Sequence, residues 1–189
     1  TADDLADEGD RPAGERRALL EQMRVQLAAL PERPDPAAAW TAPLAQAIAT
    51  HELPKPLLAD LLSAFEQDTW VQRYPDRAAL LDYCRRSANP VGRLLLHLSG
   101  VNDAEALQQS DAVCTALQLI NHWQDLGVDI RKPRLYLPEA DLARHGVDPE
   151  AVLRGVHSEA LARCVAELND WALALMAQGR PLPRRVGGR

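Results

Sequence analysis

The chain has 189 residues, of which 47% are hydrophobic and 25% are charged. This balance is typical of a folded globular protein and excludes a disordered one. The 21 basic and 27 acidic residues leave a formal net charge of −6, which argues against general nucleic-acid binding through a basic surface. The longest uncharged stretches are too short to cross a bilayer, so we expect no transmembrane helix.

The three cysteines, Cys84, Cys114 and Cys164, lie far apart in the sequence. Their spacing matches no zinc site, and their odd number argues against a disulfide framework. We therefore expect a cytoplasmic protein.

Proline and glycine divide the chain into segments with the periodicity of amphipathic helices. Runs of alternating β-branched residues, which would indicate strands, are absent from the sequence. We therefore predict an all-α protein. The predicted helices cover 14–30, about 37–50, a segment opened by Pro54 and Pro56, a segment from Asp76 to about Leu98 kinked at Pro90, about 103–129, Pro138 to near Gly146, and about 149–178.

The two ends of the sequence carry little apolar support of their own. Residues 1–10 form a dense acidic cluster, and residues 181–189 form a basic, glycine-rich tail. A short cluster of like charges needs a longer helix behind it to be held in place. We therefore expect the sequence to be the central portion of a larger helical domain, truncated at both ends.

Acidic residues four positions apart occur near the start of the chain, at Asp3 and Asp7, and again at Asp125 and Asp129. Like charges at this spacing on a helix repel by roughly 0.2–0.5 kcal/mol per pair, and a bound cation removes the repulsion. Mg²⁺ suits such a site, because it takes one or two carboxylates and completes its octahedron with water and phosphate oxygens. The spacing alone also fits solvent-exposed helix faces.

A polar stripe runs along the predicted helix that contains the second acidic pair. Gln118, Asn121, Asp125 and Asp129 fall on one side when successive residues are turned by 100°, and no lysine or arginine interrupts residues 111–129. The opposite side is apolar. A surface helix more often mixes basic residues into such a stripe, so the pattern favours the polar lining of a cavity, with an exposed face as the alternative.

Three basic residues follow this stripe, Arg131, Lys132 and Arg134. An arginine fork or a lysine beside metal-binding carboxylates suits diphosphate oxygens. For Arg131 and Lys132 we favour the simpler interpretation of solvated loop charges.

The stretch YCRRSANPVG places Tyr83 and Ser87 on one helix face, with Ala88 and Gly92 as small residues four apart. Pro90 removes a backbone hydrogen bond and kinks the helix. Small residues beside a kink would let an apolar ligand approach the backbone, and a tyrosine ring could face a cationic centre. An ordinary proline kink with close helix packing is the equal alternative.

Together, DDLAD at 3–7, YCRRSANPVG at 83–92 and LQLINHWQDLGVDIRKPRLYLP at 117–138 resemble the squalene/phytoene synthase family of head-to-head prenyl synthases. Within it, the sequence is most similar to the bacterial hopanoid-pathway branch that forms hydroxysqualene or squalene. The resemblance implies an isoprenoid-synthase helical bundle, with residues 1–189 as a single synthase-like domain and the central portion of a longer chain.

The resemblance also implies roles for individual residues. Metal binding, by Mg²⁺ with Mn²⁺ as the alternative, is implied for Asp3, Asp7, Asp125 and Asp129. Substrate binding is implied for Asp4, Ser87, Asn89, Asn121 and Arg134. Catalytic positions that line the reaction cavity are Tyr83, Gln118 and Tyr136.

The implied reaction converts presqualene diphosphate to hydroxysqualene by diphosphate loss, rearrangement of the carbocation and capture of water. We do not expect NADPH, because an alcohol product needs no hydride. The amide of Asn89, next to Pro90, could hold a water near the cation, and a structural turn amide is the alternative.

Two kinds of alternative function remain. Related members instead condense farnesyl diphosphate to presqualene diphosphate, squalene or a phytoene-type product. A non-catalytic helical scaffold or a lipid-binding domain is the alternative of another class. The expected partner is a prenyl diphosphate, presqualene or farnesyl, with no nucleic acid and with peripheral contact at the inner face of the membrane; the oligomeric state is left open.

Overall fold

The computed structural model describes residues 2–7 and 11–186, without the side chains of residues 3, 6 and 7. These residues form helices joined by turns and no strand; a single isolated bridge pairs Arg73 with Leu135. The all-α prediction is confirmed. The helices are α1 Ala2–Asp7, α2 Ala13–Ala29, α3 Thr41–His51, α4 Lys55–Asp68, α5 Arg77–Ser87, α6 Asn89–Leu98, α7 Ala104–Gln124, α8 Leu126–Asp129, α9 Glu139–Arg144, α10 Pro149–Leu153, α11 Glu159–Gln178 and a 3₁₀ turn, Leu182–Arg184.

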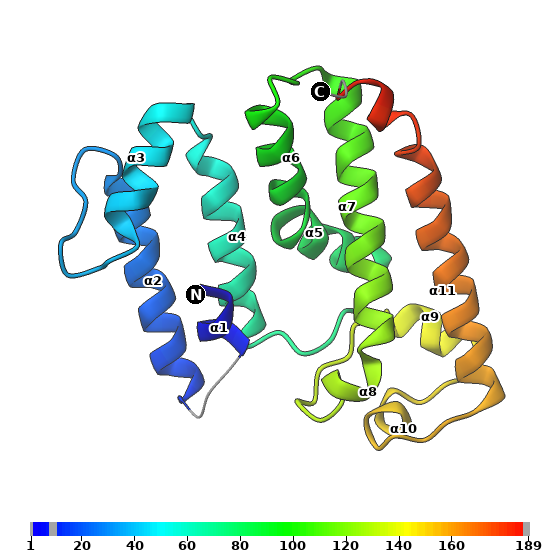
Figure 1. The fold of residues 1–189 in the computed structure, drawn as a ribbon. Helices are drawn as coiled ribbons and strands as arrows, with labels where there is room; N and C mark the ends of the chain where they lie inside the picture. The colour runs from blue at the N-terminus through cyan, green and yellow to red at the C-terminus, as the bar shows by residue number, and fades with distance from the viewer. Residues whose placement is uncertain (1, 8–10, 187–189) are drawn as a thin grey trace.

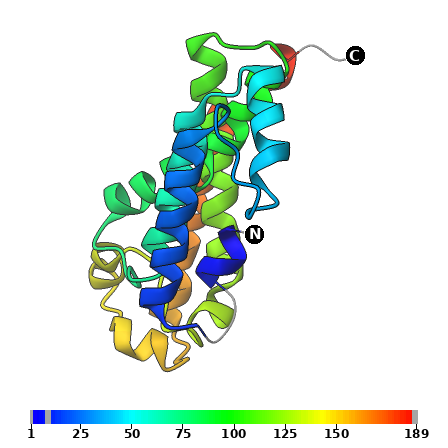
Figure 2. The same cartoon turned by 90° about the vertical axis from the view of Figure 1, so that its left-hand side faces the viewer.

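The helices form two groups that meet at α4 (Figure 1). On one side, α1, α2 and α3 stand beside α4, and on the other side α5, α6 and α11 surround the long helix α7. The turned view shows that α2, α7 and α11 run along the long axis of the molecule (Figure 2). Helix α4 contributes Leu62 to one hydrophobic core and Ala64 to the other, so it is the shared wall between the two groups.

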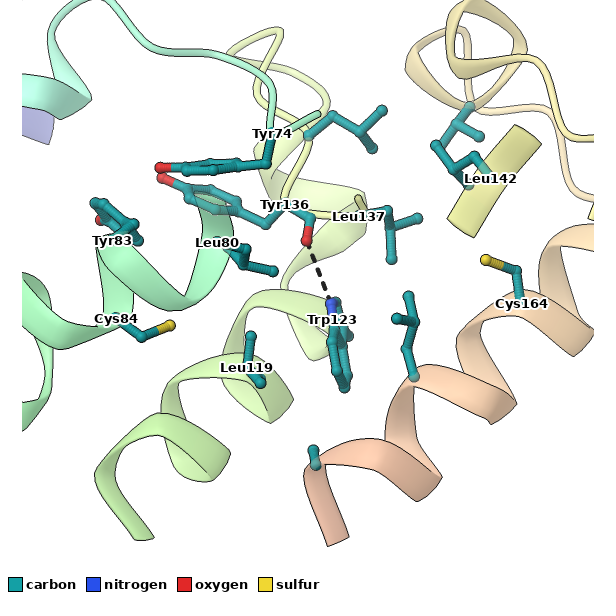
Figure 3. Packing of buried hydrophobic residues seen from close by; sticks show 14 of the residues in the cluster. Tyr74, Leu80, Tyr83, Cys84, Leu119, Trp123, Tyr136, Leu137, Leu142 and Cys164 are labelled. Carbon is teal, nitrogen blue, oxygen red and sulfur yellow. Dashed lines mark hydrogen bonds between the residues drawn. The ribbon is translucent and has the colours of Figure 1, made fainter. Parts of the chain in front are cut away.

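The larger core lies between α5, α7, α11 and the segment 134–138 (Figure 3). Leu80, Leu119 and Leu168 are fully buried there, and burying a leucine side chain contributes roughly 1.5–3 kcal/mol. The indole nitrogen of Trp123 donates a hydrogen bond of 3.4 Å to the main-chain oxygen of Tyr136. The core therefore fixes the segment that carries two of the predicted site residues, Arg134 and Tyr136.

Three predicted helices are each divided in two. The one predicted over about 103–129 divides at Asp125, between α7 and α8. The segment predicted to kink at Pro90 breaks at Ala88, because a proline has no N–H to donate to the carbonyl four residues earlier. The segment predicted over 149–178 is interrupted more widely. Helix α10 ends at Leu153, Gly155 adopts a φ of +75°, and a new helix begins after Ser158, whose hydroxyl accepts from the Leu161 N–H.

Helix α6 packs closely against α7 through Gly92. A β-carbon at this position would lie 2.4 Å from Ser110 Oγ and 2.5 Å from Cys114 Sγ. For Gly92, the structure thus supports the interpretation as a close helix contact rather than as an approach path for a ligand. In the described part of the chain, no helix has both the length and the hydropathy needed to span a membrane.

Candidate active site

A hollow of about 480 Å³ opens between α4, α5 and α7 and the segment after α8; we call it the polar hollow. Among the residues whose side chains are described, eight predicted site residues line it, although they come from three separate parts of the sequence. They are Tyr83, Ser87, Gln118, Asn121, Asp125, Asp129, Arg134 and Tyr136. The remaining lining residues are Leu61, Phe65, Asp68, Val91 and His122.

One wall of the polar hollow is the predicted polar stripe. The helix predicted over 103–129 ends at Gln124, with Asp125 as the capping residue between α7 and α8. The main chain still continues in helical register, because the Asp129 N–H donates to the main-chain oxygen of Asp125 at 2.9 Å. Both carboxylates therefore face the same hollow. Asn121 and Asp125 are exposed, so the hollow is open to solvent rather than enclosed.

A second part of the lining is aromatic and buried. The rings of Tyr83 and Tyr136 lie 5.9 Å apart between centroids, and Tyr74 packs 5.5 Å from each of them behind the hollow. Burial is the main cause that raises the pKa of the Tyr83 hydroxyl, and the negative charge of Asp68 raises it further. Burial likewise raises the pKa of Tyr136. Both hydroxyls therefore keep their protons at neutral pH.

His122, which was not among the predicted site residues, joins this aromatic group. Its ring stacks on Tyr136 at 3.7 Å between centroids, and its Nε2 lies 3.1 Å from Gln118 Nε2. Burial, with a smaller contribution from Arg134, lowers the pKa of His122 to about 4, so the imidazole is neutral at neutral pH. The signal was present in the sequence, because position 122 lies 40° from Gln118 on the same helical wheel.

Asp68, at the end of α4, is a second lining residue that was not predicted. Its Oδ2 accepts a hydrogen bond of 2.9 Å from the Tyr83 hydroxyl. Its main-chain oxygen accepts one of 3.0 Å from Arg134 Nη2, and Arg134 is buried. Nothing in the local sequence marks Asp68, because both partners are distant along the chain.

Asn89, predicted to bind substrate or hold a water, lies apart from the polar hollow. It is buried between α6 and α7, its side-chain oxygen accepts a 2.9 Å hydrogen bond from Thr115 Oγ1, and it does not line the polar hollow. The structure thus gives Asn89 a hydrogen bond between two helices, in keeping with the alternative of a structural amide.

The first acidic motif is described only in part. Asp4 is exposed on α1 and does not line the hollow, whereas the side chains of Asp3 and Asp7 lie outside the described residues. The main chain of α1 packs against α2 and α4. Arg131 and Lys132 are exposed.

The sequence profile described as squalene/phytoene synthase matches residues 1–189, the whole chain. The chain belongs to the squalene/phytoene synthase family. It is 35% identical over 187 residues to the hydroxysqualene synthase of Rhodopseudomonas palustris, an alignment that covers 98% of this chain and 62% of that protein. It is 34% identical to the presqualene diphosphate synthase of the same organism, over 97% of this chain and 67% of that protein.

The crystal structure of squalene synthase HpnC from Alicyclobacillus acidocaldarius matches with a TM-score of 0.87 at 37% identity, covering 97% of this chain and 68% of that chain. The predicted isoprenoid-synthase fold is therefore confirmed. The chain spans only about 62% of the length of the R. palustris hydroxysqualene synthase.

For a member of this synthase family, the donor set of the polar hollow fits a magnesium–diphosphate site. Within the residues whose side chains are described, no group of three or more His, Cys, Asp or Glu is placed to hold a metal ion. Mg²⁺ needs only one or two carboxylates when phosphate oxygens and water complete its coordination. The lining contains two carboxylates, Asp125 and Asp129, together with Arg134, whose side chain is of a type that suits phosphate oxygens.

Two grooves with mainly apolar surface adjoin the polar hollow. One, of about 550 Å³, shares Ser87 and Val91 with the hollow and continues over Leu117 and Ile120 on α7. The other, of about 160 Å³, shares Leu61 and Phe65 with it and has a wholly apolar lining between α2, α3 and α4. A polar site thus borders apolar surface on two sides.

Proposed function

We propose that this chain is the central part of a Mg²⁺-dependent enzyme that converts presqualene diphosphate to hydroxysqualene, with residues 1–189 as one domain. The observation that supports the proposal most directly is the junction between the polar hollow and the two apolar grooves. A substrate with a diphosphate head and long hydrocarbon chains combines the two chemistries that these surfaces offer.

In this proposal, Asp125 and Asp129 hold Mg²⁺, and Asn121 and Arg134 bind the diphosphate. A bound Mg²⁺ would supply the positive charge that neutralises the diphosphate as it departs. Arg134 is suited to phosphate oxygens because its planar guanidinium donates several hydrogen bonds in one plane. We assign Asp3 and Asp7 to the same site, because their helix packs against α4, which also lines the hollow.

Loss of diphosphate leaves a cyclopropylcarbinyl cation, which rearranges and is captured by water. Tyr83 and Tyr136 present electron-rich rings toward the hollow, and such rings attract a cation. Gln118 offers an amide beside the same lining, and apolar side chains limit the approach of other water. Because capture by water gives an alcohol, the reaction requires no NADPH.

The test is product analysis of the complete gene product with presqualene diphosphate in heavy-oxygen water, with and without Mg²⁺ and NADPH. We expect a Mg²⁺-dependent alcohol that carries the label in its hydroxyl group and forms without NADPH. An unlabelled hydrocarbon that requires NADPH would contradict the hydroxysqualene assignment.

Two further outcomes separate the alternatives. Turnover of farnesyl diphosphate but not of presqualene diphosphate would identify a condensing enzyme, in keeping with the similarity to a presqualene diphosphate synthase. If no prenyl diphosphate is converted, and Asp125→Asn and Asp129→Asn leave Mg²⁺ affinity unchanged, the chain is a non-catalytic scaffold or lipid binder.

We also propose that the enzyme works in the cytoplasm with peripheral contact at the inner face of the membrane, because its product is a hydrocarbon-like alcohol that partitions into lipid. Co-sedimentation of the complete gene product with lipid vesicles tests this contact. A nucleic-acid partner is not part of the proposal, in keeping with the net charge of −6.

A further inference from the structure

We infer that Asp68 is a positioning residue that sets the direction of the Tyr83 hydroxyl in the polar hollow, an inference that rests on the function proposed above. Asp68 ends α4 and Tyr83 lies in α5, so the contact joins two neighbouring helices that both contribute to the lining. The oxygen–oxygen distance is 2.9 Å, within the range of a hydrogen bond.

The direction of this hydrogen bond follows from the chemistry of its partners. An ionised carboxylate can only accept, whereas a phenol has one proton to donate. Burial raises the pKa of Tyr83, so the phenol keeps that proton. The proton is therefore directed at Asp68, and the lone pairs of the tyrosine oxygen are directed elsewhere.

This arrangement suits a site in which positive charge develops. A phenol that donates to a carboxylate has a more electron-rich oxygen and ring, and the effect is larger where the surroundings are apolar. Tyr83 is 3% exposed and lines the hollow in which the proposed reaction would form its carbocation.

Asp68 has a second contact that can be separated from the first. Arg134 donates to the main-chain oxygen of Asp68, at 3.0 Å, and not to the carboxylate in that contact. A substitution of the Asp68 side chain therefore changes the partner of Tyr83 while leaving the main-chain acceptor of Arg134 in place.

The experiment is a double-mutant cycle in the complete gene product, with diphosphate release from presqualene diphosphate as the assay. Asp68→Asn should lower kcat by about tenfold to a hundredfold, the range expected for losing a hydrogen bond to a charged group. In a Tyr83→Phe background the same substitution should change kcat by less than about twofold, because the hydroxyl through which it acts is gone. If Asp68→Asn lowers kcat by the same tenfold to hundredfold in the wild-type and in the Tyr83→Phe background, the inference is overturned.

Tyr74→Phe provides a matched control in the same aromatic group. The Tyr74 hydroxyl accepts from Gln67 Nε2 at 3.2 Å, and Tyr74 does not line the polar hollow. We expect Tyr74→Phe to leave kcat unchanged and to preserve the full effect of Asp68→Asn. Loss of that effect in the control background would show that Asp68 acts on general packing, which would also overturn the inference.

A second measurement does not depend on turnover. With ¹³C at the ring carbon that bears the hydroxyl, the Tyr83 NMR signal should shift when Asp68 becomes Asn, while the Tyr74 signal should not. An unmoved Tyr83 signal in a folded variant overturns the inference, whatever the substrate proves to be. A wild-type protein that converts no prenyl diphosphate overturns the proposed function instead, so the two failures are distinguishable.

Discussion

His122 lies flat against Tyr136, with 3.7 Å between ring centroids and 7° between ring planes. The pair forms where α7 passes the segment after α8, and Trp123, the next residue, holds the same segment through the main-chain oxygen of Tyr136. Two consecutive residues of one helix thus contact the same tyrosine, one through its ring and the other through its backbone. The aromatic side of the polar hollow is therefore continuous with the larger core.

Stability should depend on pH through His122. Its pKa falls from 6.5 to about 4 on folding, so between these values the unfolded chain binds more protons than the folded one. The free energy of unfolding should therefore decrease as pH falls from 6.5 towards 4, by an amount on the order of 2 kcal/mol. Urea unfolding of the complete gene product at several pH values measures this, and His122→Phe should flatten the dependence. If the free energy of unfolding of His122→Phe depends on pH as strongly as that of the wild type, other groups cause the dependence.

Asp141 should be important for stability, because it is 5% exposed and accepts hydrogen bonds from Arg77 at 2.8 and 3.1 Å and a further one from Arg144. Asp141→Ala should lower the free energy of unfolding by about 1–3 kcal/mol, because Arg77 loses a partner in a partly buried position. The matched control is Glu159→Gln, which breaks an exposed ion pair with Arg163 and should change stability by less than about 0.5 kcal/mol. If Asp141→Ala and Glu159→Gln lower the free energy of urea unfolding by the same amount, the prediction is contradicted.

Gly92→Ala should destabilise the contact between α6 and α7. The added methyl group would lie 2.4 Å from Ser110 Oγ and 2.5 Å from Cys114 Sγ, so these side chains must rotate or the helices must move apart, at about 1–3 kcal/mol. Gly14→Ala is the control, because a β-carbon there meets nothing within 4 Å and alanine favours the helix. Thermal unfolding should show a lower Tm for the first variant and an equal or higher Tm for the second.

Asp125→Ala should separate activity from stability. Asp125 is exposed, caps the C-terminal end of α7 and lies four residues from Asp129, so its negative charge is unfavourable to both the helix dipole and its neighbour. We expect turnover of presqualene diphosphate to be lost while thermal stability without Mg²⁺ is equal or higher. Asn121→Ala should likewise abolish turnover. Unfolding of either variant would instead indicate a structural role.

The sequence predicts the helices well where their ends are marked locally. Asp76 and Asp103 both accept from a backbone N–H three residues later, as residues that begin helices do. The prediction over 149–178 was wrong because helical periodicity continues across Gly155, while the backbone there turns to a positive φ. Periodicity records which face is apolar and does not record a local reversal of the chain.

The residues of the candidate site also differ in whether the local sequence predicts them. The residues of one helix stripe, such as Gln118 and Asp125, could be predicted because they share a face. Asp68 could not, because its contacts with Tyr83 and Arg134 span 15 and 66 positions and depend on how α4 packs. The hydrogen-bond partner of Asn89, Thr115, lies on a different helix, so the local sequence does not predict that contact.

The position of α4 as the shared wall has a consequence for how this protein tolerates change along its length. Residues close together on α4 contact different parts of the protein. Leu62 packs in one core and Ala64 in the other, while Phe65 and Asp68 line the polar hollow. Inserting one residue in the middle of α4 would turn everything after it by about 100° and misplace all of these contacts together. Natural length variation in this protein should therefore avoid α4 and collect in exposed turns, such as the one between α2 and α3.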